Sequence, residues 1–143
     1  MAAKEVGLRW GAYHFLHKGA IATQVKHFLD TAQPDASMLV ALDHEGDASL
    51  SEVRAFLDSA AATIGRKLVL YSGHTIKGQL GKQADTYFGS HRLWHAQYGS
   101  KPVTQASWPD GPWLWQYSDK GSVAGLSPVD VNAFAGTEEQ LRA

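Results

Sequence analysis

Two carboxylic acids, Asp43 and Glu45, stand two positions apart at the end of an apolar run that begins at Met38. In a β-strand such side chains share one face, with Cα atoms about 7 Å apart. Two like charges this close do not ionise independently, so one carboxyl group should keep its proton toward neutral pH. A general acid needs that property. The spacing alone fits a structural role equally well, in which the carboxylates cap the next helix or bind solvent.

The strand that carries this pair is predicted over residues 38–45, because an uninterrupted apolar run is typical of a strand buried on both faces of a parallel sheet. The carboxyl end of such a strand is where α/β proteins place their chemistry. Amphipathic helices are predicted on both sides of it. One covers residues 20–32, and the other begins at Ser49, which has capping-box spacing to Glu52, and stops at Gly65.

The other predicted elements alternate between strand and helix in the first half of the chain. Further strands are predicted over residues 10–15, 67–72, 92–98, 113–118 and 129–134. A short helix is expected over residues 76–83, a loop over 99–112, a turn over 119–121 and a tail helix from Thr137. This order predicts an α/β fold with a parallel sheet and right-handed crossovers, either open or closed into a barrel.

Length, charge and cysteine content limit the class of protein. The chain has 143 residues, no cysteine and a net charge of −1, with no cluster of Lys and Arg. A single domain over residues 1–143 is predicted, and neither nucleic acid nor a membrane is expected as a partner. The absence of cysteine excludes disulfides and thiolate metal sites. Residues 1–5 lack the apolar core of a signal peptide, which predicts a soluble chain without an export signal.

Six short segments, taken in order along the chain, resemble the family 25 glycoside hydrolases, the Chalaropsis-type lysozymes of bacteria, fungi and phage endolysins. The segments are residues 11–15, 42–45, 70–72, 93–98, 113–118 and 129–132. The resemblance implies an α/β fold of the TIM-like (β/α)5β3 barrel type. It also implies hydrolysis of the β-1,4 bond between N-acetylmuramic acid and N-acetylglucosamine in peptidoglycan, with no metal and no organic cofactor.

The resemblance assigns catalytic roles to three acids. Glu45 matches the family's proton donor, and Asp43 would act beside it as an electrostatic partner that orients the substrate or stabilises the developing cation. Asp130 matches the acid of the family's last strand through an Asp-x-Asn motif. Glycoside hydrolysis needs an acid for the leaving oxygen and a negative group facing an oxocarbenium-like transition state, so the residue types suit the reaction. If the substrate's own 2-acetamido oxygen attacks the anomeric carbon, no carboxylate of the chain need be the nucleophile.

Aromatic and amide side chains on the predicted strands would line the family's substrate groove. The resemblance implies this role for Tyr13, Tyr71, Trp94, Tyr98, Trp115 and Gln116. Strand alternation puts Trp115 and Gln116 on opposite faces, and the sequence leaves open which face meets the substrate. For each aromatic side chain, packing in the core is about as well supported as contact with a sugar ring.

The family's first strand, with its Asp-x-Ser motif, has no match in residues 1–9. The barrel is therefore expected to be truncated at its N-terminus. The strand over residues 10–15 would then expose an edge that can pair with another copy of the chain, giving a homo-oligomer. A chain of this kind would be a fragment of a longer gene or a degenerate prophage lysin, cytoplasmic until released or acting at the cell wall.

Two other functions are compatible with the sequence. A catalytically impaired remnant of such an enzyme would bind peptidoglycan glycan strands without cleaving them. A metal-dependent hydrolase would combine some of the seven histidines with the acids. The ligand spacing for this is poor, because no predicted helix carries a His-x-x-x-His pair and His14 of the nearest pair, His14 and His17, is predicted in a strand. No metal site is therefore expected.

Overall fold

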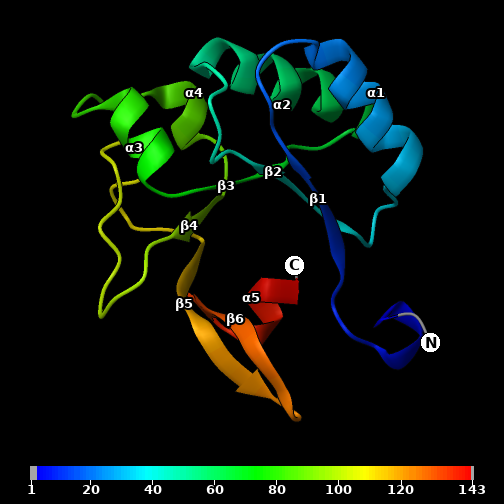
Figure 1. The fold of residues 1–143 in the computed structure, drawn as a ribbon, viewed down its shortest axis with the longest axis vertical. Helices are drawn as coiled ribbons and strands as arrows, with labels where there is room; N and C mark the ends of the chain where they lie inside the picture. Colours follow the sequence, from blue (N-terminus) through cyan, green and yellow to red (C-terminus); the bar gives the residue numbers. More distant parts are fainter. Residues whose placement is uncertain (1–2, 143) are drawn as a thin grey trace. The chain divides into compact units, whose positions relative to one another are not determined.

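The computed structural model describes residues 3–142 (Figure 1). The chain forms two compact units, Met1–Leu70 and Tyr71–Ala143. The protein is of the α/β class, and its six strands follow one another in the sheet in their sequence order. The sheet is mixed, because its last two strands are antiparallel whereas the earlier pairs with an assigned register are parallel. The single domain over residues 1–143 stays a prediction.

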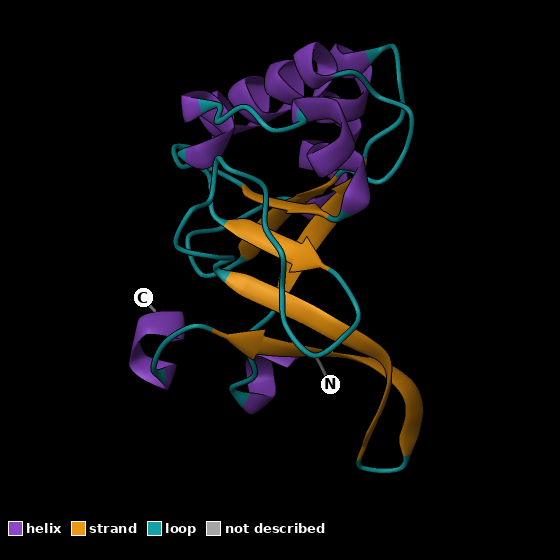
Figure 2. Cartoon of the chain, turned by 90° about the vertical axis from the view of Figure 1, so that its left-hand side faces the viewer, coloured by secondary structure: helices purple, strands orange, loops and turns teal. Residues whose placement is uncertain are grey.

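The first unit contains two parallel strands and the helices that follow them. Its elements are a 3₁₀ helix η1 (Ala3–Val6), β1 (Gly11–Phe15), α1 (Ile21–Ala32), β2 (Leu39–Asp43) and α2 (Leu50–Ile64). In the register of β1 and β2, Tyr13 is the partner of Ala41 and Phe15 is the partner of Asp43. Figures 1 and 2 show α1 and α2 packed together on one side of the strands.

Helix α2 begins and ends at the residues that the sequence predicts. The Ser49 side chain accepts a hydrogen bond from the Glu52 amide, and the Glu52 carboxylate accepts one from the Ser49 amide, so the capping box is complete. Gly65 ends the helix with a φ of 79°, a conformation that glycine adopts without a steric penalty. The apolar face of the helix is fully buried and consists of Val53, Phe56, Leu57 and Ala60.

The second unit is richer in strands. Strand β3 (Val69–Ser72) begins in the first unit and ends in the second. It is followed by α3 (His74–Leu80), α4 (Thr86–Gly89), β4 (Leu93–Ala96), β5 (Leu114–Val123), β6 (Leu126–Phe134) and α5 (Glu138–Arg142). The short helix α4 was not predicted. Its N-cap is Asp85, whose side chain accepts a hydrogen bond from the Phe88 amide at 3.1 Å.

The hairpin of β5 and β6 differs from its prediction. The turn predicted over residues 119–121 is wrong, because β5 continues beyond it and the chain reverses at Ala124 and Gly125. Both residues have positive φ angles, 49° and 84°, as a tight two-residue turn requires. A Cβ atom added to Gly121 would lie 2.4 Å from Cγ1 of Val131, so this glycine permits close packing across the ribbon. Figure 2 shows the long two-stranded ribbon that results.

Strand β1 has a free edge. Among the strands of residues 3–142, β1 is hydrogen-bonded only to β2. The exposed edge that the sequence predicts for this strand is therefore present. Pairing of this edge with a second copy of the chain stays a prediction.

Candidate active site

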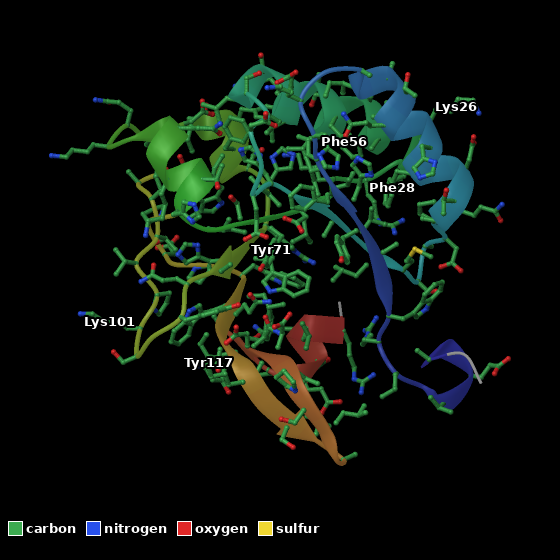
Figure 3. The ribbon with its side chains drawn as sticks, in the orientation of Figure 1. Lys26, Phe28, Phe56, Tyr71, Lys101 and Tyr117 are labelled. Atoms are coloured by element: carbon green, nitrogen blue, oxygen red, sulfur yellow. The ribbon has the colours of Figure 1, made fainter. Side chains whose placement is uncertain are left out.

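Asp43 lies on the face of the β1–β2 pair that is turned away from α1 and α2. Register partners in a parallel pair point to the same side, so Tyr13 and Phe15 share the face of Asp43. His14 points to the other face, where its ring stacks on Phe56 of α2 with 4.9 Å between the centroids. Figure 3 labels Phe56 beside β1. Tyr13 is 68% exposed and Phe15 is 40% exposed, so this face presents two aromatic side chains together with an acid.

Asp43 is the member of the acidic pair that is set to retain a proton. Its side chain is only 8% exposed, and its Oδ1 atom is buried without a hydrogen-bond partner in the described part of the chain. The pKa of Asp43 is raised from 3.8 to about 6, chiefly by burial and also by the negative charge of Glu45. The elevated pKa expected for one carboxyl group of the pair therefore belongs to Asp43.

Glu45 lies outside the strand. The strand predicted over residues 38–45 is too long, because β2 ends at Asp43 and the chain then enters the loop before α2. Strand alternation therefore does not position Glu45, and its side chain is exposed. The two acids still interact, since the charge of Glu45 acts on Asp43. A buried acid and an exposed acid thus stand together at the carboxyl end of β2.

In the second unit, a polar and aromatic cluster forms around Gln116, which is 4% exposed. The Gln116 Oε1 atom accepts hydrogen bonds from the hydroxyl groups of Tyr71 at 2.8 Å and Tyr98 at 3.4 Å. The ring of Tyr71, labelled in Figure 3, meets Trp94 edge to face at 5.2 Å. The Trp94 indole nitrogen donates to Oδ1 of Asn132 at 2.7 Å. We call these five residues the Gln116 cluster.

The strand register explains how this cluster is assembled. Gln116 of β5 is the partner of Ala96 on β4 and of Asn132 on β6. Trp94 shares a face with Ala96 because the two are separated by one residue on β4. By the same alternation Asp130 shares a face with Asn132, about 7 Å along β6. Asp130 is exposed and therefore available to a ligand on the face of the Gln116 cluster.

Trp115 lies on the other face of β5. Its indole nitrogen donates to the carbonyl oxygen of Gln97 at 2.7 Å, and its ring lies 5.4 Å from that of Tyr117. The structure thus brings four of the predicted substrate-binding residues together and leaves Trp115 apart from them. The four are Tyr71, Trp94, Tyr98 and Gln116. Tyr13 belongs to β1 of the first unit.

Two residues join the candidate site that the sequence did not single out. Phe15 shares the face of Asp43, and its alternation with Tyr13 on the predicted strand was the signal for it. Asn132 holds the indole of Trp94, and it is the last residue of the Asp-x-Asn motif that begins at Asp130. In both cases the residue lay within a recognised segment but had no assigned role.

Residues 3–142 show neither a metal-binding cluster nor a helix that could span a membrane. No group of three or more His, Asp and Glu side chains in this range is arranged to hold a metal ion. The longest helix, α2, is too short to cross a bilayer, and no other helix of this range has the length and apolar character that spanning requires.

Comparison with known proteins gives a consistent result. The model of glycosyl hydrolases family 25 matches residues 1–126. The chain is 33% identical over 156 residues to the uncharacterized protein YegX of Escherichia coli K12. The alignment covers 99% of this chain and 53% of YegX. It is also 30% identical over 142 residues to the autolytic lysozyme of Clostridium acetobutylicum. This second alignment covers 93% of this chain and 41% of the lysozyme. The chain therefore spans about half the length of the curated relatives that it matches.

The fold agrees with the family. A bacterial lysozyme from Streptomyces coelicolor superposes with a TM-score of 0.83 at 25% identity, covering 98% of this chain and 73% of the lysozyme. The α/β fold expected from the resemblance is confirmed by this match. The family model matches residues 1–126 of the 143, and the fold is that of a lysozyme. This chain therefore belongs to glycosyl hydrolases family 25.

Proposed function

We propose that this chain is a lysozyme-type glycoside hydrolase that cleaves the β-1,4 bond between N-acetylmuramic acid and N-acetylglucosamine in peptidoglycan at the cell wall. The observation that carries the proposal is the acidic pair at the carboxyl end of β2, in a chain of family 25. Two of its relatives are named as lysozymes, which supports peptidoglycan as the substrate.

In the proposed reaction the two acids have different roles. Glu45, which is exposed, protonates the bridging oxygen of the glycan. Asp43, which is buried, supplies negative charge to the developing oxocarbenium ion or polarises the 2-acetamido group of the substrate. Because the charges of the two acids interact, a proton on one of them favours the ionised form of the other. In the reactive form the proton lies on Glu45 and the charge on Asp43. Burial of Asp43 favours the opposite arrangement in the free chain, so the proposal requires that bound glycan shift the proton to Glu45.

The second unit would contribute to glycan binding. The rings of Tyr71, Trp94 and Tyr98 offer flat faces to sugar rings, and the Gln116 and Asn132 amides fix how these rings are held. We assign to Asp130 the role that its Asp-x-Asn match implies, a further acid acting on the bound glycan.

A reducing-end assay tests the proposal directly. The purified chain is expected to release new reducing ends from isolated peptidoglycan, because each cleaved glycosidic bond exposes one. The parallel measurement is sedimentation of the chain with the same peptidoglycan. Binding without release of reducing ends would contradict the catalytic proposal and indicate a glycan-binding module instead.

A matched pair of tryptophan variants tests which face of the second unit meets the glycan. Trp94→Ala is expected to weaken binding to peptidoglycan by about 10- to 100-fold, because loss of a stacking aromatic in a binding site typically costs about 1–3 kcal/mol. Trp115→Ala removes the same ring from the opposite face of β5 and is expected to bind as the parent does. Weaker binding by Trp115→Ala with parent-like binding by Trp94→Ala would reverse the assignment.

A further inference from the structure

The acid loop, residues 44–49, carries Glu45 from the end of β2 to the start of α2. It lies against the β1–α1 loop, residues 16–20. A Cβ atom added to Gly46 would lie 3.1 Å from the carbonyl oxygen of Leu16, so the two backbones approach closely at this point. Because β-strand pairing ends before Glu45, the position of this acid depends on how the acid loop is held.

Glu52, in the first turn of α2, binds both loops with a single carboxylate. Its Oε1 atom accepts a hydrogen bond from the Gly19 amide at 2.7 Å. Its Oε2 atom accepts from the amide of Ser49 at 2.7 Å and from the hydroxyl of Ser49 at 2.8 Å. Hydrogen bonds from the Ser49 and Gly19 amides lower the pKa of Glu52, so its carboxylate is charged at neutral pH and both oxygens are acceptors.

Gln24 of α1 makes the β1–α1 loop a fixed support. Its Nε2 atom donates to the carbonyl oxygens of His17 at 2.8 Å and Gly19 at 2.6 Å. Its Oε1 atom accepts from the His17 amide at 3.1 Å and lies 2.9 Å from Nε2 of His14. Since His14 is itself stacked on α2, the loop is attached to both helices of the first unit.

A second link between the loops, the ion pair of Lys18 and Asp47, is weaker. The Nζ and Oδ2 atoms are 2.8 Å apart, but the side chains are 71% and 63% exposed. Exposed ion pairs contribute little because solvent and salt screen them. Of these two side-chain links between the loops, the one through Glu52 is therefore the stronger.

We propose that Glu52 is a positioning residue, which fixes the acid loop against the β1–α1 loop and thereby holds Glu45 in place for proton transfer. This inference rests on the proposed function of Glu45. Glu52 itself does not contact the glycan in this proposal. Its capping-box role is local to α2, whereas its bond to Gly19 reaches 33 residues back along the chain.

The variant Glu52→Gln tests the proposal with little change in shape. An amide has one acceptor oxygen, so its NH2 group would face one of the two backbone donors and release one loop. We expect kcat on peptidoglycan to fall by about tenfold and KM to stay within about twofold, because misplacement of a catalytic group affects the chemical step more than binding.

Ser49→Ala is the matched control. It removes the acceptor for the Glu52 amide, and so opens the same capping box, but it leaves the Glu52 carboxylate free to accept from the amides of Gly19 and Ser49. We expect Ser49→Ala to lower thermal stability as Glu52→Gln does and to keep the parent kcat. An equal loss of kcat in both variants would show that only the helix cap matters, and would overturn the proposal.

Amide hydrogen exchange gives a readout that does not need activity. In Glu52→Gln, amides of residues 16–20 and 44–48 are expected to exchange faster than in Ser49→Ala, because the link between the two loops is weakened. Parent-like exchange in residues 44–48 of Glu52→Gln would overturn the proposal. If the parent chain released no reducing ends, the proposed function would fail, and the exchange of the two loops would still decide whether Glu52 holds them together.

Discussion

The variant Glu45→Gln is expected to release reducing ends from peptidoglycan about 10²- to 10⁴-fold more slowly than the parent, the range typical of losing a general acid. A glutamine amide cannot protonate the bridging oxygen, so the leaving group would depart without its proton. The side chain is exposed in the acid loop, so the fold should not depend on it. The rate is measured at saturating peptidoglycan, with thermal unfolding recorded on the same samples.

Glu139→Gln is the control for this variant. Glu139 is an exposed glutamate of α5, so the control makes the same chemical change at a site with no proposed role. It should retain the parent rate. A parent-like rate in Glu45→Gln, or an equal loss in both variants, would remove Glu45 from the proposed reaction.

The variant Asp43→Asn is expected to be more stable than the parent at pH 7. The pKa of Asp43 is raised from 3.8 to about 6, mainly by burial and also by the charge of Glu45, so the folded state binds this proton more tightly than the unfolded state does. The free energy of unfolding therefore falls as pH rises from about 4 to about 6, and the penalty is complete above that window. The difference between the two pKa values corresponds to a loss of at most about 3 kcal/mol in the free energy of unfolding. An uncharged asparagine avoids this loss.

Thermal unfolding at two pH values checks this expectation. At pH 7 the melting temperature of Asp43→Asn should exceed that of the parent by several degrees. At pH 4 the gain should be much smaller, because Asp43 of the folded parent is then protonated and neutral. Reducing-end release should fall sharply in the same variant, because the buried negative charge is lost. Equal or lower stability at both pH values would contradict the effect of burial on Asp43.

Asp47→Asn provides the opposite case. Asp47 is exposed, and its hydrogen bond from Lys18 lowers its pKa. Its ionised form is therefore favoured in the folded state, and that contribution is present at neutral pH and lost as pH falls. Replacing Asp47 should leave stability at pH 7 unchanged or slightly lower. A gain in both variants would indicate a general effect of reducing negative charge.

The helices could be predicted from the sequence because their signals are local. The capping box of Ser49 and Glu52 and the glycine at position 65 define α2 without reference to the rest of the chain. The β5–β6 turn could not be located in this way. The Asp-Lys-Gly segment has turn-forming residues, yet packing of Gly121 across the ribbon and the positive φ angles of Ala124 and Gly125 determine where the chain reverses.

The residues of the candidate site could be predicted from the sequence, but their arrangement could be predicted only in part. The spacing of Asp43 and Glu45 drew attention to both acids, but the burial that raises the pKa of Asp43 depends on packing by residues distant in sequence. The functional face of β5 was also undetermined. It follows from the register of β5 with β4 and β6, which places Gln116 beside Asn132 and leaves Trp115 on the other side.

The exposed end of the β5–β6 ribbon makes the protein suitable for engineering. Val123 is 59% exposed and Leu126 is 68% exposed, and the two residues between them form the turn. Exposed loop tips are where inserted sequence is best tolerated. A peptide epitope or fluorescent label grafted between Ala124 and Gly125 would be separated along the ribbon from the Gln116–Asn132 pair. The hairpin thus offers an attachment point for immobilising or labelling the protein.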